Sequence, residues 1–155
     1  MDFQTPNWCC LKMAELVPPD CKQVLEPTPG EGNLVRALKP KFEVVAPKQF
    51  WEVDPVSFYD CVVMNPPFTP MSEGYKIFYR CMNMADHVIA LMPWLVLINS
   101  ERRTEDIVQF GLKKVIHLPR RTFPGSRVQC CILCMDRGFR GSTEIEFAIL
   151  PSNPV

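Results

Sequence analysis

Short hydrophobic runs alternate along the chain with segments in which apolar residues recur every three or four positions. The runs are bounded by proline, glycine or polar residues and predict strands at residues 22–26, 42–46, 60–64, 87–91, 114–118, 127–136 and 144–150. The segments of helical periodicity predict helices at residues 6–16, 33–38, 72–85 and 104–111, the first with Thr5 as N-cap and Pro6 at its first position. Strands that alternate with helices favour an α/β fold with a doubly wound, mostly parallel sheet. The consecutive strands near the C-terminus favour an antiparallel strand at its edge.

The size and composition of the chain indicate one globular domain. It has 155 residues, 47% of them hydrophobic and 22% charged, which suffices for a core and is too apolar for a disordered chain. The formal net charge is zero, so no overall field directs the molecule to nucleic acid or membrane. Residues 101–140 nevertheless carry nine basic and four acidic side chains. This surplus predicts either a local phosphate-binding surface or a solvated face.

Cysteine usage and the N-terminal residues indicate a reducing compartment. The first residues contain neither a basic nor an apolar signal region, and the longest apolar run, residues 88–98, is too short to cross a bilayer. We therefore expect a cytoplasmic protein without a membrane partner, in which the eight cysteines are free thiols. Cys131 and Cys134 form a CxxC pair. The strand pattern around them places the two thiols on opposite faces, so no metal site is expected.

The first segment with candidate chemistry joins a predicted strand to a predicted helix. Glu26 stands at the carboxyl end of the strand, where ligands bind in open α/β sheets. Gly30 and Gly32 follow in the turn, and glycine allows a ligand to approach the backbone more closely than a Cβ would. The segment predicts a polar binding loop, and a plain strand–helix turn is the alternative.

The second segment ends the strand at residues 60–64 with the tetrapeptide Asn65-Pro66-Pro67-Phe68. Two prolines remove two backbone donors and leave their carbonyl groups free to accept hydrogen bonds. The Asn65 side chain offers a further carbonyl oxygen, so the cluster can receive both hydrogens of a planar amino group. Phe68 can stack on the ring that carries this amino group. The alternative is a proline turn that only closes the strand.

Together these segments resemble the S-adenosylmethionine-dependent amino-methyltransferases, in particular a compact and divergent member of the NPPF-type DNA adenine-N6 family. The resemblance covers most of residues 3–137 and implies a Rossmann-like methyltransferase sheet. It makes residues 1–155 a single minimal catalytic domain without a separate target-recognition domain. It implies cofactor contacts from Thr5, Pro6, Glu26, Pro27, Gly30 and Gly32, and catalysis by Asn65, Pro66, Pro67 and Phe68.

The chain departs from this family where the nucleoside part of S-adenosylmethionine would bind. The second strand ends in Ala46, where the family has an acid for the ribose hydroxyls. Gln49 stands where the family has an Asp that touches the adenine amino group, and Phe50 follows it to pack on the adenine ring. We expect S-adenosylmethionine to bind, and the missing acids to weaken its binding.

The resemblance implies direct methyl transfer to an exocyclic nitrogen, with adenine N6 in DNA as the first hypothesis. Acceptance of the two amino hydrogens by Asn65 Oδ1 and the Pro66 carbonyl group would stabilise the charge that develops on nitrogen. The base must leave the duplex, where Phe68 would stack on it. Five basic residues are candidates for phosphate contacts: Arg102, Arg103, Arg120, Arg121 and Arg127.

The expected partner is DNA or another nucleic acid, with a separate specificity subunit as a further partner. Two alternatives stay open. The first is a degenerate, non-catalytic methyltransferase fold that acts as a binding subunit, which the missing acids favour. The second is a methyltransferase for RNA or for protein glutamine.

Overall fold

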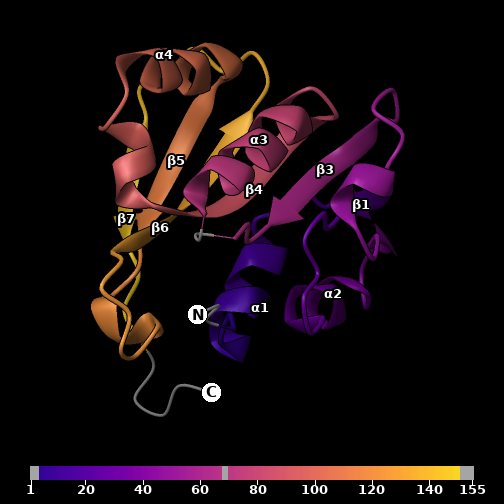
Figure 1. The fold of residues 1–155 in the computed structure, drawn as a ribbon, viewed down its shortest axis with the longest axis horizontal. Coiled ribbons are helices and arrows are strands. Elements are labelled where there is room, and N and C mark those ends of the chain that lie inside the picture. Colours follow the sequence, from indigo (N-terminus) through magenta and orange to yellow (C-terminus); the bar gives the residue numbers. More distant parts are fainter. Residues whose placement is uncertain (1–3, 68–69, 151–155) are drawn as a thin grey trace.

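A twisted sheet runs through the centre of the computed structural model (Figure 1). The structure describes residues 4–67 and 70–150, and in these ranges seven strands form one sheet in the order β2-β1-β3-β4-β6-β5-β7. The strands are β1 (Gln23–Leu25), β2 (Glu43–Val45), β3 (Tyr59–Met64), β4 (Ala85–Pro93), β5 (Leu112–His117), β6 (Cys130–Asp136) and β7 (Glu144–Phe147). All described pairs are parallel except those of β6, which is antiparallel to both β4 and β5.

Helices cover both faces of the sheet, as the doubly wound prediction requires. They are α1 (Asn7–Glu15), α2 (Asn33–Leu38), α3 (Met71–Met82) and α4 (Glu101–Phe110), with the 3₁₀ turns η1 (Phe50–Glu52), η2 (Trp94–Leu97) and η3 (Arg120–Thr122). Strand alternation separates two cores. In β3, Val62 and Met64 pack beneath α3 and α4, while Cys61 and Val63 pack beneath α1 and α2. The predicted α/β class is confirmed, and no described helix is long and apolar enough to span a membrane.

The antiparallel strand lies inside the sheet and not at its edge. β6 is an almost continuous hydrophobic run, and its residues pair on one side with β4 and on the other with β5. The edge strand on this side of the sheet is β7, which is parallel to β5 and alternates acidic residues with the exposed Ile145 and Phe147. An apolar run suits a strand that is buried on both faces, whereas charged residues at every second position suit an exposed edge strand. Both patterns were present in the sequence.

The start of the first helix also differs from the prediction. Pro6, and not Thr5, occupies the N-cap of α1, and no side chain caps this helix. The carbonyl group of Pro6 accepts the amide hydrogens of Cys9 and Cys10, both at 3.0 Å. Thr5 is thereby left outside the helix with a hydroxyl that is free for another role.

The CxxC pair behaves as its strand pattern predicts. Cys131 lies in the core beneath α3 and α4, and Cys134 packs on the opposite side beneath α1 and α2. The eight cysteines are free thiols, as expected. In the described parts of the chain, no group of three His, Cys, Asp or Glu side chains is arranged to hold a metal ion.

The strand order creates a crevice between β1 and β3. From β1 the chain passes through α2 to β2 on one side, and β3 then lies on the other side of β1. Connections that leave two neighbouring parallel strands in opposite directions open a crevice at the carboxyl ends of those strands. Glu26 follows β1 and Asn65 follows β3, so the topology brings the two predicted motifs to this crevice.

Candidate functional site

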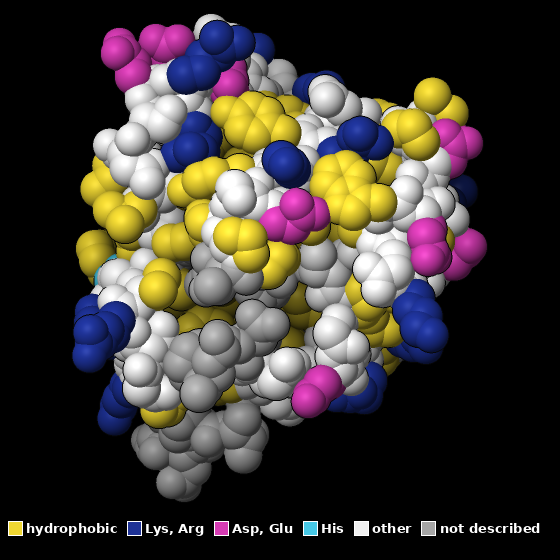
Figure 2. Space-filling view, viewed as in Figure 1, with side chains coloured by type: hydrophobic (Ala, Val, Ile, Leu, Met, Phe, Trp, Pro, Cys, Tyr) yellow, Lys and Arg dark blue, Asp and Glu magenta, His cyan; other side chains and the backbone are white. Residues whose placement is uncertain are grey.

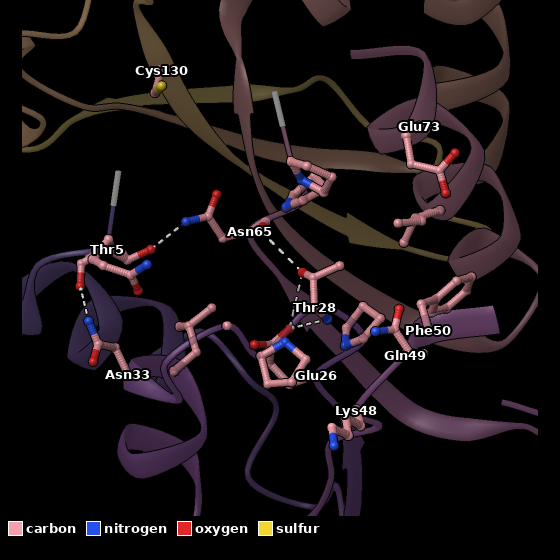
Figure 3. Close-up of a pocket in the computed structure, with 18 of the residues that line it drawn as sticks. Thr5, Glu26, Thr28, Asn33, Lys48, Gln49, Phe50, Asn65, Glu73 and Cys130 are labelled. Atoms are coloured by element: carbon pink, nitrogen blue, oxygen red, sulfur yellow. Dashed lines mark hydrogen bonds between the residues drawn. The ribbon is translucent and has the colours of Figure 1, made fainter. Parts of the chain in front are cut away.

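A cavity of about 390 Å³ opens at the carboxyl ends of β1 and β3, which is the size of a small-molecule pocket (Figure 3). Six separate segments of the chain contribute to its wall. The predicted site residues that line it are Thr5, Glu26, Pro27, Gly30, Gln49, Phe50, Asn65, Pro66 and Pro67. Phe68, predicted to stack on the target base, lies outside the described residues. The structure therefore brings both motifs to one cavity.

Glu26 places a buried carboxyl group in this cavity. Its side chain is only 1% exposed, and its Oε1 accepts hydrogen bonds from the Thr28 amide at 2.8 Å and the Thr28 hydroxyl at 3.4 Å. Burial raises the pKa of Glu26 from its ordinary 4.5 to about 7, and the bonds from Thr28 partly oppose this rise. No cationic side chain pairs with Glu26 among the described residues. The group is therefore suited to a cationic ligand.

The backbone and side chain of Asn65 are held at two points. The Thr28 hydroxyl donates to the Asn65 carbonyl oxygen at 3.1 Å, and Asn65 Nδ2 donates to the Thr5 hydroxyl. Figure 3 shows the amide nitrogen of Asn65 turned toward Thr5 and its oxygen turned away. Within the described part of the chain, neither Asn65 Oδ1 nor the Pro66 carbonyl oxygen receives a hydrogen bond. Two acceptors are thus available at the end of β3.

Helix α3 packs directly against this loop through Gly74, a residue that the sequence analysis did not select. Gly74 is buried, and a Cβ at this position would overlap the carbonyl oxygen of Pro67 and lie 2.8 Å from the end of the Met71 side chain. Glycine is a poor helix former, so a glycine inside a helical pattern usually has a packing reason. That signal was present in the sequence, and here the reason is the close approach of the loop.

The glycines of the first motif serve the backbone conformation. Gly30 has φ +52°, and a Cβ there would meet only the Gln4 side chain, at 4.0 Å. Gly32 has φ +87° and is the N-cap of α2. Gly32 and Pro6 do not line the cavity, so their places in the fold are the starts of α2 and α1.

The far end of the cavity is formed by the segment after β2. Phe50 is 6% exposed, and the ring nitrogen of the next residue, Trp51, donates to Glu73 Oε1 at 2.7 Å. Lys48 and Glu73 also line this end, so it carries one basic and one acidic side chain, with no acid at Ala46. The sequence analysis did not select Thr28, Lys48, Trp51 or Glu73, because their positions depend on contacts between distant segments.

The five candidate phosphate-binding arginines fall into two groups. Arg120, Arg121 and Arg127 are exposed on the segment of residues 119–129, and this segment also contributes Phe123 and Ser126 to the cavity wall. The cavity is therefore bordered by a basic loop.

Arg102 and Arg103 lie on α4 and do not line the cavity. Arg102 pairs with Asp106 at 3.4 Å, and the Arg103 guanidinium stacks 3.7 Å from the centre of the Tyr75 ring. On the face drawn in Figure 2, basic side chains lie in separate small groups, some near the margins and some among hydrophobic side chains in the upper half.

Comparison with known proteins identifies the fold. No family model matches the chain, and no curated protein matches it in sequence. A solved structure of a modification subunit assigned to a type I restriction enzyme of Vibrio vulnificus YJ016 superposes with a TM-score of 0.75 at 15% identity, over 97% of this chain and 48% of that one. A protein of Listeria monocytogenes assigned to the class I S-adenosylmethionine-dependent methyltransferases gives 0.70 at 15% identity, over 94% and 65%.

The same fold occurs in a protein of Pyrococcus horikoshii assigned as an RNA methyltransferase, with a TM-score of 0.59 at 17% identity over 88% of this chain and 87% of that one. The resemblance to S-adenosylmethionine-dependent methyltransferases is thus confirmed at the level of the fold. This chain spans about half the length of the modification subunit.

Proposed function

We propose that this chain is the catalytic domain of an S-adenosylmethionine-dependent methyltransferase that acts on an exocyclic amino group, with adenine N6 in DNA as its substrate. One observation carries the proposal. Asn65 Oδ1 and the Pro66 carbonyl oxygen receive no hydrogen bond from the described residues, and both residues line a cavity that also holds the buried Glu26 carboxyl group. A planar amino group has two hydrogens to donate, and this pair of acceptors matches them.

The residues present fit the cofactor at its methionine end. Glu26 is buried without a cationic partner among the described residues, and an ammonium group of the ligand would supply one. Pro27 and Gly30 would form the wall beside it, and Phe50 and Gln49 would meet the adenine ring. When bound, S-adenosylmethionine supplies an electrophilic methyl group on a sulfonium.

The protein's own contribution to transfer is electrostatic and positional. The adenine amino lone pair is delocalised into the ring, so the free base is a poor nucleophile. Asn65 Oδ1 and the Pro66 carbonyl group would accept the amino hydrogens and stabilise positive charge as it develops on nitrogen. Thr28 would hold the Asn65 backbone in place, which preserves the geometry on which this contribution depends.

We assign DNA binding to the basic loop of residues 119–129, because it borders the cavity. Reversal of charge at Arg120 and Arg121 should weaken DNA binding and reduce its dependence on salt, since each lost phosphate contact lowers the salt slope by about one unit. Arg102→Glu is the matched control, because Arg102 is exposed but lies on α4. Equal losses from both changes would contradict this assignment.

The choice of target sequence is assigned to a separate specificity subunit or domain. The described cavity and its basic loop account for a base and nearby phosphates, but they offer no element that reads base edges in a groove. The Vibrio protein is described as a modification subunit, and this chain spans 48% of it.

A second candidate function is a non-catalytic binding subunit, which one observation favours. β2 ends without an acid, and Lys48 lines the cavity near that point. Transfer of isotope-labelled methyl from S-adenosylmethionine to duplex DNA, to RNA and to protein separates the candidates. We expect label in N6-methyladenine of DNA; label in RNA or in glutamine would reassign the substrate. Cofactor binding without transfer to any of them would support the binding subunit.

A further inference from the structure

The side chain of Asn65 has two chemically opposite ends of nearly the same shape. A rotation of 180° exchanges the acceptor Oδ1 with the donor Nδ2. If Nδ2 faced the substrate, two donors would oppose each other and the proposed acceptor would be lost. The proposed function therefore requires something that fixes the rotation of this amide.

Thr5 is the described residue that bonds to this amide. A hydroxyl can accept from Nδ2 or donate to Oδ1, so it holds the position of the amide, and the structure places Nδ2 on its side. The Thr5 hydroxyl accepts a hydrogen bond from Asn65 Nδ2, across 60 positions of the chain. With Nδ2 engaged on the side of Thr5, Oδ1 is directed away from it (Figure 3). The Thr5 side chain is 4% exposed, so water does not readily replace the hydroxyl.

Thr5 is itself held by the two helices on its face of the sheet. Its carbonyl oxygen accepts a hydrogen bond from Asn33 Nδ2 of α2 at 3.1 Å and a weaker one from Cys10 Sγ of α1 at 3.6 Å. Pro6 follows and begins α1 as its N-cap. The position of the hydroxyl is therefore determined before any ligand binds.

We propose that Thr5 is a positioning residue for Asn65: its hydroxyl engages the Nδ2 end of the amide and holds the side chain where Oδ1 can reach the target amino group. The proposal rests on the proposed function of Asn65. It differs from the role that the sequence resemblance implies for Thr5, which is a contact with the cofactor. The two roles predict different kinetic consequences.

The kinetic test compares Thr5→Val, which removes the hydroxyl and keeps the shape, with Thr5→Ser, which keeps the hydroxyl. Loss of the hydroxyl leaves Nδ2 unpaired against a methyl group and no longer holds the amide in place, so we expect kcat to fall about 10-fold or more in Thr5→Val. Thr5→Ser should recover most of this loss. The dissociation constant of S-adenosylhomocysteine should stay within about twofold of the wild-type value in both variants.

Thr143→Val is the matched control, because it also removes a hydroxyl that makes a hydrogen bond, here to the Leu112 carbonyl group at 2.8 Å, far along the sheet from the cavity. It should leave kcat unchanged. Weaker binding of S-adenosylhomocysteine in Thr5→Val, with kcat preserved, would overturn the proposal and assign Thr5 to the cofactor.

A second measurement does not depend on activity. The side-chain amide signals of Asn65 can be assigned in a nitrogen–proton NMR spectrum by their loss in Asn65→Ala. We expect these two protons to be protected from solvent exchange in the wild type and to exchange faster in Thr5→Val. Unchanged exchange would overturn the proposal even in an active enzyme. Faster exchange in a protein that methylates nothing would support the contact and contradict the proposed function alone.

Discussion

The ends of β1 and β3 differ from the end of β2 in what they present to the cavity. After β1 and β3 the chain presents Glu26 and Asn65, both held by hydrogen bonds to Thr28. After β2 it presents the exposed Ala46 and then Lys48, with no acid at either position. The three strands are parallel neighbours, so all three ends lie along the same side of the sheet.

This difference separates the two halves of the proposed chemistry. Glu26, which would hold the methionine part, and Asn65, which would accept from the target amino group, are both in place. Hydrogen bonds from Thr28 connect them. The group that would hold the ribose is missing. A fold that had lost its function would have no reason to keep one half only, so we interpret the site as a transfer site with a weakened nucleoside end.

The largest effect is expected from Asn65→Ala, which removes the side-chain acceptor at the end of β3. Loss of one such electrostatic group costs about 10²–10³ in kcat. Asn83→Ala is the matched control, because Asn83 is an exposed C-cap residue of α3. Equal transfer rates in wild type and Asn65→Ala would remove this residue from catalysis, provided that the control is also unchanged.

Gly74→Ala tests the packing of α3 against the loop that follows β3. Alanine normally stabilises a helix relative to glycine by about 1 kcal/mol. Here the added Cβ would overlap the Pro67 carbonyl oxygen, so α3 and the loop must move apart. We expect a lower melting temperature and a kcat reduced by about 10-fold or more, since small displacements of positioning groups are costly. Ser72→Ala, on the exposed side of the same helix, should change neither; a more stable Gly74→Ala with full activity would contradict the account.

Much of this site could be predicted from the sequence, because its parts are local motifs at strand ends. The alternation of strands and helices places Glu26 and Asn65 at the same edge whatever their detailed contacts. The roles of Thr5 and Gly74 could not be predicted in this way. Each depends on a contact with the loop after β3, and only tertiary packing decides where that loop lies.

The position of β6 inside the sheet was predictable and was missed. Its run of apolar residues differs from the alternating pattern of β7, and that difference indicates which of the two is the edge strand. The expectation followed the order of the strands along the chain, which does not determine their order in the sheet.

A smaller effect is expected from pH, through Glu26. Burial raises the pKa of this carboxyl group to about 7, so it is largely neutral at pH 6 and ionised at pH 8. A cationic ligand favours the ionised form, so cofactor affinity should rise with pH by up to about 10-fold per unit below pH 7 and level off above it. Glu26→Gln should bind more weakly and lose this pH dependence; a wild-type affinity independent of pH from 6 to 8 would contradict the assignment.

The same group should also affect stability, in the opposite direction. Because its folded pKa lies above the ordinary value, Glu26 contributes stability that is present below pH 4.5 and is lost as the pH rises through about 7. The denaturant midpoint of the ligand-free protein should therefore fall between pH 5 and pH 8 by more in the wild type than in Glu26→Gln. Parallel curves for the two proteins would show that Glu26 is not buried as described.

The smallest effect is expected at the end of β2, where the acid is missing. Ala46→Glu would restore an acid after β2, and a charge-assisted hydrogen bond to a ribose hydroxyl is worth about 1.5–3 kcal/mol when fully formed. We expect a tightening of about 10-fold, because the new side chain is exposed. Val56→Glu adds the same charge in an exposed loop and should have no effect. An equal gain in cofactor affinity in Ala46→Glu and Val56→Glu would indicate a general electrostatic effect and contradict a specific contact at position 46.

The most direct measurement is a calorimetric titration of the wild-type protein and Gly30→Val with S-adenosylmethionine. Gly30 lines the cavity at φ +52°, a conformation that valine does not adopt readily. The account predicts wild-type binding with a dissociation constant of about tens of micromolar, because one charge-assisted hydrogen bond is missing, and no measurable binding in a folded Gly30→Val. Absence of binding in the wild type, or equal affinity in the two proteins, would contradict a cofactor site in this cavity.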